Sequence, residues 1–341
     1  MPANTSSGET EYPSLTSPPA LAELHLSPQP NAGAPEERAS MKQKLLCLLV
    51  VFVSASTARA VPLGGVPEGY VVTPFGYYHS SCVQVLGKGD ILKPDELVVQ
   101  HKDGSLDSMR ACAYAHYTSG RTPVEPNAKE PSIAHAWIED VFAQTNTSYG
   151  GLITEWKVPP TPKSNDGQTL YFFPGMEDDK DVKTIIQPVL GWNSNYKDAW
   201  EIASWNCCTQ GTVFESTPLL VQPGDTILGT MHDKCKAGTL ECSSWDVITD
   251  DVTSHQQTEL VNTSSFKQTF NWAFSNVLEV YNVVKCSDLP PNNALTVSDI
   301  ALYTDGFVQI KNPAWIVSVA NVTPKCDYGG FGTETKTTIT Y

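Results

Sequence analysis

Apolar and polar residues alternate in short segments along most of the chain after residue 60. Residues 199–205 read Ala-Trp-Glu-Ile-Ala-Ser-Trp, a period of two that is typical of a strand with one buried face. Turn-forming residues separate such segments, as where Pro-Gly-Asp at 223–225 precedes the next strand-like run. No amphipathic pattern of ten or more residues predicts a helix. We therefore expect strands at near-regular spacing, at 133–143, 152–158, 169–173, 184–192, 199–206, 212–221, 226–231, 244–249, 258–262 and 276–284.

Many short strands joined by Gly- and Pro-rich turns predict an all-β fold, an antiparallel β-sandwich. We expect its core at residues 131–290, with the C-terminal strands of 291–341 packing on that core. Residues 61–130 have β-type runs of their own and two cysteines, so we expect a disulfide-stapled N-terminal β segment there. Three prolines within 120–131 favour a linker between this segment and the core.

The N-terminal residues have the pattern of an export signal. A basic start at 41–44 precedes nine apolar residues at 45–53, and the segment ends in Ala58-Arg59-Ala60. This arrangement predicts a secretory signal peptide over 41–60, too short to span a bilayer. Residues 1–40 precede a second methionine, and we interpret them as a disordered leader or a start-site extension. We therefore expect a product that is secreted or held in the lumen of the secretory pathway.

The odd number of cysteines, 9, becomes even once Cys47 leaves with the signal peptide. Eight cysteines in an oxidising compartment most naturally form four disulfides. We expect a bond between Cys82 and Cys112, and one from Cys207 or Cys208 to Cys235 or Cys242, because adjacent cysteines are not expected to bond to each other. The eight are Cys82, Cys112, Cys207, Cys208, Cys235, Cys242, Cys286 and Cys326.

Export also gives meaning to three N-x-S/T sequons. Asn146, Asn262 and Asn321 are candidate glycosylation sites, and we expect each at the surface.

The net charge of the chain disfavours some classes of binding partner. Lys+Arg 22 against Asp+Glu 37 gives a formal net charge of -15, which argues against binding nucleic acid or an anionic membrane. No metal and no cofactor is expected, because the seven histidines are scattered and no cysteine pair has zinc-ligand spacing. The acidic run Glu-Asp-Asp-Lys-Asp at 177–181 is interpreted as a solvated hairpin tip. The sequence leaves the oligomeric state open.

Two strands each carry a single polar residue among apolar ones. Gln187 lies in the run 184–192, and Glu279 lies in the run 275–283. A carboxyl on the inner face of a sheet should have a raised pKa, and beside an amide it could act as a general acid or base. The alternative is that either side chain points outward, since neighbouring strand residues alternate faces.

The order of short motifs around this pair resembles that of the glutamic peptidases (eqolisins), which are secreted fungal enzymes. That resemblance implies a concanavalin-like jelly-roll sandwich with Gln187 and Glu279 as the catalytic pair. It covers roughly residues 131–290 and rests on W-K-V-P-P at 156–160, I-I-Q at 185–187, P-G-D-T-I at 223–227 and L-E-V-Y at 278–281.

Aromatic residues crowd these motifs, and an aromatic pocket at the pair would suit a hydrophobic small molecule. We expect Trp156, Trp192, Trp205 and Tyr281 to bind it. In layout, a secreted, disulfide-stapled β-protein with sequons, the chain also resembles the fungal hetero-Diels–Alderases.

Three functions therefore stay open. The first hypothesis is a tailoring enzyme of secondary metabolism that dehydrates and cyclises a hydrophobic metabolite by hetero-Diels–Alder chemistry. The second is an acid-acting glutamic peptidase. The third is a carbohydrate-binding sandwich, in which Glu279 would have no catalytic role. We favour the first, because residues 61–130 contain no dibasic processing site and are expected to stay part of the fold.

Overall fold

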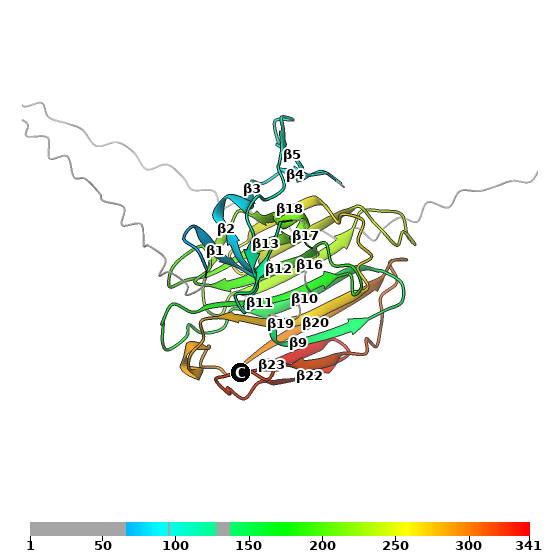
Figure 1. The fold of residues 1–341 in the computed structure, drawn as a ribbon. Coiled ribbons are helices and arrows are strands. Elements are labelled where there is room, and N and C mark those ends of the chain that lie inside the picture. Colours follow the sequence, from blue (N-terminus) through cyan, green and yellow to red (C-terminus); the bar gives the residue numbers. More distant parts are fainter. Residues whose placement is uncertain (1–65, 95, 127, 129–136) are drawn as a thin grey trace, which may run out of the picture. The chain divides into compact units, whose positions relative to one another are not determined.

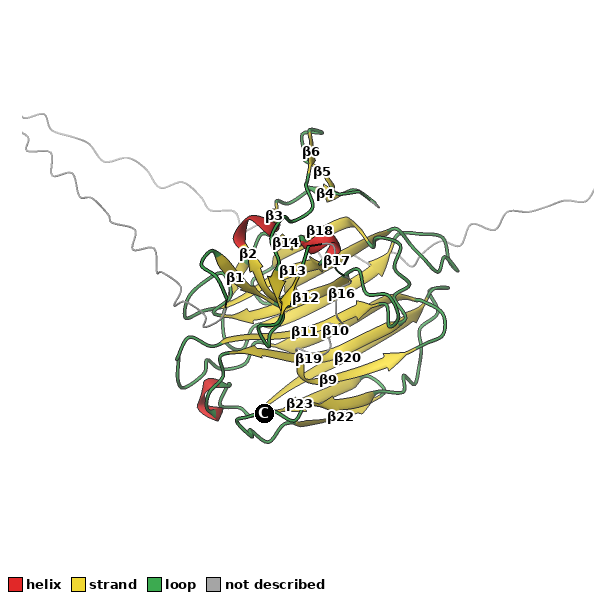
Figure 2. Cartoon of the chain, in the orientation of Figure 1, coloured by secondary structure: helices red, strands yellow, loops and turns green. Residues whose placement is uncertain are grey.

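The computed structural model describes residues 66–94, 96–126, 128 and 137–341. The expected leader and signal peptide lie outside these residues. The described chain is all-β, with 3-10 turns at Ser80–Cys82, Thr209–Gly211 and Cys286–Asp288 and no α-helix among the described residues (Figure 2). None of its helical turns could cross a membrane.

The largest element is a nine-stranded sheet, which is antiparallel except at one edge. Its order is β21-β9-β19-β11-β12-β13-β14-β3, with β15 pairing β13 (Figure 1). The strand bounds are β21 Ile316–Val319, β9 Trp137–Gln144, β19 Trp272–Tyr281, β11 Thr169–Glu177, β12 Ile185–Trp192, β13 Trp200–Cys207, β14 Val213–Ser216, β3 Val83–Leu86 and β15 Leu219–Val221.

A seven-stranded antiparallel sheet forms the second layer. Its order is β18-β17-β16-β10-β20-β23-β22. β20 pairs with β10 near the middle of this sheet, so the sandwich extends past residue 290 to the C-terminus. The bounds are β18 Gln256–Ser264, β17 Ser244–Asp251, β16 Thr226–Asp233, β10 Tyr149–Lys157, β20 Ala294–Thr304, β23 Lys336–Thr340 and β22 Gly329–Thr333.

The core between the two sheets is made of alternate residues from each. Phe172, Leu190 and Ile202 of the nine-stranded sheet and Leu152 and Met231 of the seven-stranded sheet are all fully buried in one cluster. Each of the ten expected strands coincides with one or two observed strands, within a few residues at the ends. The prediction succeeds because strands with one face in the core alternate apolar and polar residues with a period of two. The chain is therefore an antiparallel β-sandwich of the expected class.

We call the described residues of 66–126 the cover. The part around Val66 to Tyr78 packs against the other face of the nine-stranded sheet, whereas Leu92 and Val99 belong to the cluster between the two large sheets. The cover contains a four-stranded sheet and a three-stranded sheet, and β3 joins the large sheet parallel to β14. Its buried residues Val66, Phe75, Tyr77 and Tyr78 share one hydrophobic cluster with the sheet. We call this side of the sheet the cover-side face. The strands are β1 Tyr70–Thr73, β2 Gly76–His79, β7 His116–Tyr117, β8 Pro123–Val124, β4 Ile91–Leu92, β5 Val98–Gln100 and β6 Leu106–Ser108.

Four disulfides join the eight cysteines of the described residues. Cys82 bonds to Cys112 within the cover, as expected. The expected link from Cys207 or Cys208 to Cys235 or Cys242 is wrong: Cys207 bonds to Cys208, and Cys235 bonds to Cys242. The expectation that each of Cys207 and Cys208 reaches a distant strand is therefore not met, because Cys235 and Cys242 are already paired with each other. Cys286 bonds to Cys326.

Candidate functional site

Gln187 and Glu279 both point to the cover-side face. Side chains alternate along a strand, and the residues two positions away from Gln187, Ile185 and Val189, belong to the cluster under the cover. Val277 and Tyr281, two positions on either side of Glu279, belong to the same cluster, so Glu279 points to the same face. Both polar side chains are fully buried. Both side chains therefore point away from the core between the two sheets, as the alternative held, but the cover buries them and neither is exposed to solvent.

The two residues do not form a direct pair. Strand β11 lies between them: Glu279 is opposite Tyr171, and the register of β11 with β12 puts Gln187 opposite Gly175. One intervening strand and four residue positions correspond to about 16 Å between the two Cα atoms. The expectation of one acid–amide pair at these positions is wrong, because strand register sets separation along the sheet and sequence spacing does not reveal it.

Glu279 is a buried acid whose two oxygens differ in their hydrogen bonding. The Tyr281 hydroxyl donates a hydrogen bond to Glu279 Oε1. Oε2 makes no hydrogen bond of normal geometry, although the indole N–H of Trp137, opposite Glu279 on β9, is close enough to lower the pKa of the carboxyl. Burial raises the pKa of Glu279 to about 8, although the bond from Tyr281 acts in the opposite direction. The carboxyl is therefore protonated at neutral pH, and its Oε2 can carry a transferable proton.

Polar groups lie between this acid and the exposed 193–198 loop. Tyr171, opposite Glu279 across β11 and β19, bonds to the Ser194 hydroxyl at 3.0 Å. Glu201 accepts hydrogen bonds from the Asn195 backbone and side chain at 2.9 and 2.8 Å, and Asn195 is exposed. Asn195 also donates to Glu215 at 2.6 Å. These groups connect the Glu279 end of the face to the 193–198 loop.

Gln187 lies in apolar surroundings with both amide atoms unpaired. Trp205 is directly opposite on β13, and Gly175 on β11 adds no side chain on the other side. Glu177, two positions beyond Gly175, is also fully buried, with neither carboxyl oxygen bonded. Burial raises the pKa of Glu177 to about 8. Placing this residue in a solvated hairpin tip was therefore wrong; it ends β11, and the tip begins at Asp178.

The cover closes over both positions. The rings of Phe75 and Trp205 lie 6.0 Å apart, and those of Tyr77 and Tyr281 lie 5.3 Å apart. The Tyr171 hydroxyl donates to the Val72 carbonyl at 3.2 Å. Ligand access to Gln187 or Glu279 therefore requires movement of the cover.

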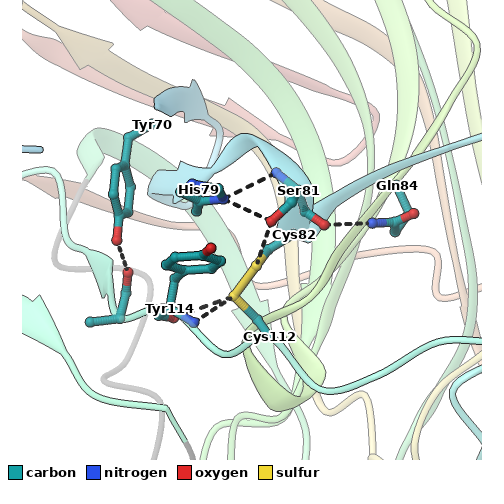
Figure 3. The surroundings of a disulfide bond; sticks show 8 residues. Tyr70, His79, Ser81, Cys82, Gln84, Cys112 and Tyr114 are labelled. Atoms are coloured by element: carbon teal, nitrogen blue, oxygen red, sulfur yellow. Dashed lines mark hydrogen bonds between the residues drawn. A yellow bond between two sulfur atoms is a disulfide. The ribbon is translucent and has the colours of Figure 1, made fainter. Parts of the chain in front are cut away.

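The Cys82–Cys112 bond holds the cover together (Figure 3). Beside it, His79 stacks on Tyr114 with ring centroids 3.7 Å apart, and the Tyr70 hydroxyl donates to the Ala115 carbonyl at 2.7 Å. The bond joins β2 and its following turn to the segment that leads into β7.

Replacing Cys82 and Cys112 together by serine is expected to loosen the cover without unfolding the sandwich. The bond closes a loop with a sequence separation of 30, and a loop of that size stabilises by about 3 to 4 kcal/mol. Amide hydrogen exchange should accelerate in β2 and β7 and stay unchanged in β11 and β19. The matched control replaces Cys235 and Cys242, which bond to each other in the loop between β16 and β17. Unchanged exchange in β2 would show that the cover is held by its packing alone.

The four aromatic residues expected to bind substrate fall on two faces. Trp205 and Tyr281 lie on the cover-side face, beside Gln187 and Glu279 respectively. Trp156 and Trp192 lie in the core between the sheets, so they do not share the face of Gln187 and Glu279 and cannot form one pocket with them there. Successive side chains of a strand point to opposite faces, so the position of each aromatic residue along its strand decides which face of the sheet it lies on.

Three residues of this face, Glu177, Tyr171 and the cover residue Tyr77, were not predicted from the sequence as part of the site. For Glu177 a signal exists, because continuing the alternation of 171–176 by one residue places it on the face of Tyr171 and Phe173. Tyr77 has no such signal, since its contact with Tyr281 joins segments far apart in the chain.

Two of the three sequon asparagines, Asn146 and Asn321, are exposed, and Asn262 is half-buried in β18. Within the described residues, no group of three or more His, Cys, Asp or Glu side chains could hold a metal ion.

No protein-family model and no curated protein sequence matches this chain. Among solved structures, it is similar to scytalido-glutamic peptidase bound to a peptide-based transition-state analogue, with 11% identity and a TM-score of 0.45 over 60% of this chain and 98% of the other. It is also similar to SCP-B, an eqolisin bound to the tripeptide Ala-Ile-His, with 12% identity and a TM-score of 0.43 over 60% and 98% of the two chains. Aspergilloglutamic peptidase from Aspergillus niger gives 14% identity and a TM-score of 0.36 over 51% and 98%. This likeness concerns the β-sandwich fold.

Proposed function

We propose that this chain is a secreted acid catalyst that dehydrates a hydrophobic alcohol and directs its hetero-Diels–Alder cyclisation. The observation that carries the proposal is Glu279: a fully buried carboxyl, held by Tyr281 through one oxygen and without a hydrogen bond of normal geometry at the other. Four disulfides support export, since such bonds persist in oxidising compartments.

The first step is acid-assisted loss of water. Glu279 gives its proton to the hydroxyl group of a benzylic-type alcohol bearing an ortho hydroxyl, and the carbon–oxygen bond breaks as water leaves. The ortho hydroxyl then loses its proton, which returns to Glu279, so the net change is one water lost and a neutral quinone methide formed. A positioned acid contributes roughly 100- to 10,000-fold to such a step.

The second step needs orientation and no proton. The quinone methide adds to an alkene, forming one carbon–carbon and one carbon–oxygen bond. Tyr77, Tyr171 and Tyr281 surround the Glu279 end of the face, with ring centroids of neighbours 5.3 and 6.1 Å apart. Aromatic walls that hold two reactants in register can supply up to about 7–11 kcal/mol.

The proposal is tested with 1-(hydroxymethyl)-2-naphthol as precursor and ethyl vinyl ether as alkene. We expect the protein to accelerate formation of the cyclic adduct over the same concentration of heat-denatured protein. An adduct formed at the same rate in both samples would contradict the proposal.

An acid peptidase is the second candidate, favoured by the diagonal placement of Glu177 beside Gln187. Any ligand reaches this face only when the cover moves, and an extended peptide needs the larger opening, so we expect no cleavage of casein at pH 4 by the intact chain. Cleavage that Glu177→Gln abolishes would establish the peptidase instead.

A further inference from the structure

A groove lies on the outer face of the seven-stranded sheet, in the other layer of the sandwich from Gln187 and Glu279. Its volume is about 620 Å³, which is within the range of small-ligand sites. The neighbouring strands β10, β20 and β23 form its floor, and the segment after β10 and the turn before β16 form one wall. We call it the β20 groove. Its polar lining residues are Glu155, Lys157, Thr296, Ser298 and Lys336.

Alternation along the strands brings these polar side chains to the groove. Trp156 and Val297, opposite each other on β10 and β20, belong to the core between the sheets. Thr337 of β23, opposite Val297, is fully buried as well. The residues next to these three in the chain therefore point away from the core. They include all five polar residues of the groove.

Two lysines flank the floor of the groove on either side of β20. Lys157 and Lys336 are both exposed, and neither ammonium group makes a hydrogen bond or an ion pair within the part of the chain that the structure describes. Two strand spacings and two residue positions separate them, which corresponds to about 12 Å between their Cα atoms. The chain as a whole is acidic, but at physiological salt a charge acts over only about 8 Å, so the groove's own groups decide what binds. Two lysines without acidic partners favour a ligand with negative charges.

The floor between the lysines favours hydroxyl groups. Thr296 and Ser298 each carry a hydroxyl, and Glu155 is opposite Ser298 on β10. Hydroxyl and carboxyl oxygens accept hydrogen bonds from the hydroxyls of a ligand. A carboxylate repels a ligand that is only an anion, so the groove suits a ligand that combines negative charges with hydroxyl groups.

One wall of the groove is apolar. Pro159, Pro160 and Pro223 line it, and proline rings hold their backbone rigid. Gly224 follows Pro223 in the turn with a φ of 95°, and a Cβ there would meet no atom within 4 Å, so this side of the groove is open. Such a wall can pack against the C–H groups of a ligand ring.

We propose that the β20 groove binds a short acidic sugar, of the class of a uronic acid disaccharide. Lys157 and Lys336 bond to its carboxylates, which are the charge-assisted contacts. Thr296, Ser298 and Glu155 bond to its hydroxyls, and the prolines contact the ring. The site goes beyond the proposed function, because it lies in the other sheet from Glu279 and needs no movement of the cover.

The probe is digalacturonic acid, titrated into the full chain in low-salt buffer with the heat of binding as the readout. We expect binding that weakens as salt is added. Lys157→Gln and Lys336→Gln should each weaken it about threefold to tenfold, the range from an exposed ion pair to a charged hydrogen bond. The matched control is Lys197→Gln, which removes an exposed lysine in the 193–198 loop and should leave binding unchanged.

Two further ligands separate recognition of an acidic sugar from simpler explanations. Galactobiose, the neutral disaccharide of the same linkage, and inorganic sulfate, an anion without hydroxyl groups on a ring, should each bind at least tenfold more weakly. The proposal is overturned if digalacturonic acid does not bind, if galactobiose or sulfate binds as tightly, or if the variant lacking both lysines binds like the unmodified chain.

The test does not depend on turnover or on a change in folding. All three substituted lysines are exposed, so the variants should keep the melting temperature of the unmodified chain. Binding in the groove is measured without any reaction, and its outcome is therefore independent of whether Glu279 catalyses dehydration.

Discussion

Raising the pH from 5 to 9 is expected to lower the free energy of unfolding by at least about 3 kcal/mol. Burial raises the pKa of Glu139, Glu177 and Glu279 to about 8 and that of Asp140 to about 6. Such a concentration of protonated carboxyls in the nine-stranded sheet makes the fold suited to mildly acidic surroundings.

The sign follows from proton binding. A carboxyl whose pKa is raised in the folded state keeps its proton where the unfolded chain has already lost it. Its contribution to stability is therefore complete below the unfolded pKa, near 4.3, and is lost as the pH rises toward 8. Each such group changes the free energy by about 1.4 kcal/mol per pH unit in that window.

Urea unfolding at a series of pH values measures this loss. Glu177→Gln should flatten the dependence, because an amide cannot ionise, while Glu241→Gln at an exposed position should leave it unchanged. Equal stability at pH 5 and pH 9 would contradict the raised pKa values.

At low pH, stability depends on a different group, the carboxylate of Asp246. Burial acts to raise the pKa of Asp246, but hydrogen bonds from His232, the Asn262 backbone and Lys234 outweigh it and lower the pKa to about 2. Stability from this carboxylate is present above its unfolded pKa and is lost as the pH falls toward 2. Asp246→Asn should therefore reduce stability at pH 6 more than at pH 2.

Glu279→Gln is expected to reduce the rate of adduct formation by roughly 100- to 10,000-fold. Glutamine is neutral, similar in shape and still accepts the hydrogen bond from Tyr281, so the fold and the aromatic walls should be retained. It cannot transfer a proton to the leaving hydroxyl.

Glu139→Gln is the matched control. Glu139 is equally buried in the adjacent strand β9, but it is opposite Leu278 on the other face and bonds to the Gly329 backbone. Its replacement should leave the rate unchanged. A Glu279→Gln variant as fast as the Glu139→Gln variant would remove Glu279 from the mechanism.

The sequence predicts strands well where one face is buried. The alternation in 199–205 yielded β13, and the lone polar residues in two apolar runs correctly indicated Gln187 and Glu279 as buried. A period of two shows which face of its own strand a residue lies on, and it does not show how far apart residues of two different strands lie. The separation between them comes from the register of β11 with both neighbours, and register depends on contacts between distant parts of the chain.

The other differences between prediction and structure have the same cause, because they too depend on contacts between distant parts of the chain. Trp156 and Trp192 were expected to line the pocket of Gln187 and Glu279, because the sequence pattern does not reveal which face of the sandwich each tryptophan packs on. The cover was expected as a β segment, whereas its place over Glu279 rests on contacts such as Tyr77 with Tyr281. Glu177 could have been identified by following the alternation one residue further.

The protonation state of Glu279 in the folded chain tests the central claim most directly. Infrared difference spectra between the unmodified chain and Glu279→Gln, recorded as the pH is raised, isolate the carboxylic acid band of this residue. The structure predicts that the band persists at pH 7 and disappears with a midpoint of about 8. Loss of the band near pH 4.3, the ordinary value for a glutamate, would show an ionised carboxylate and contradict acid catalysis by Glu279.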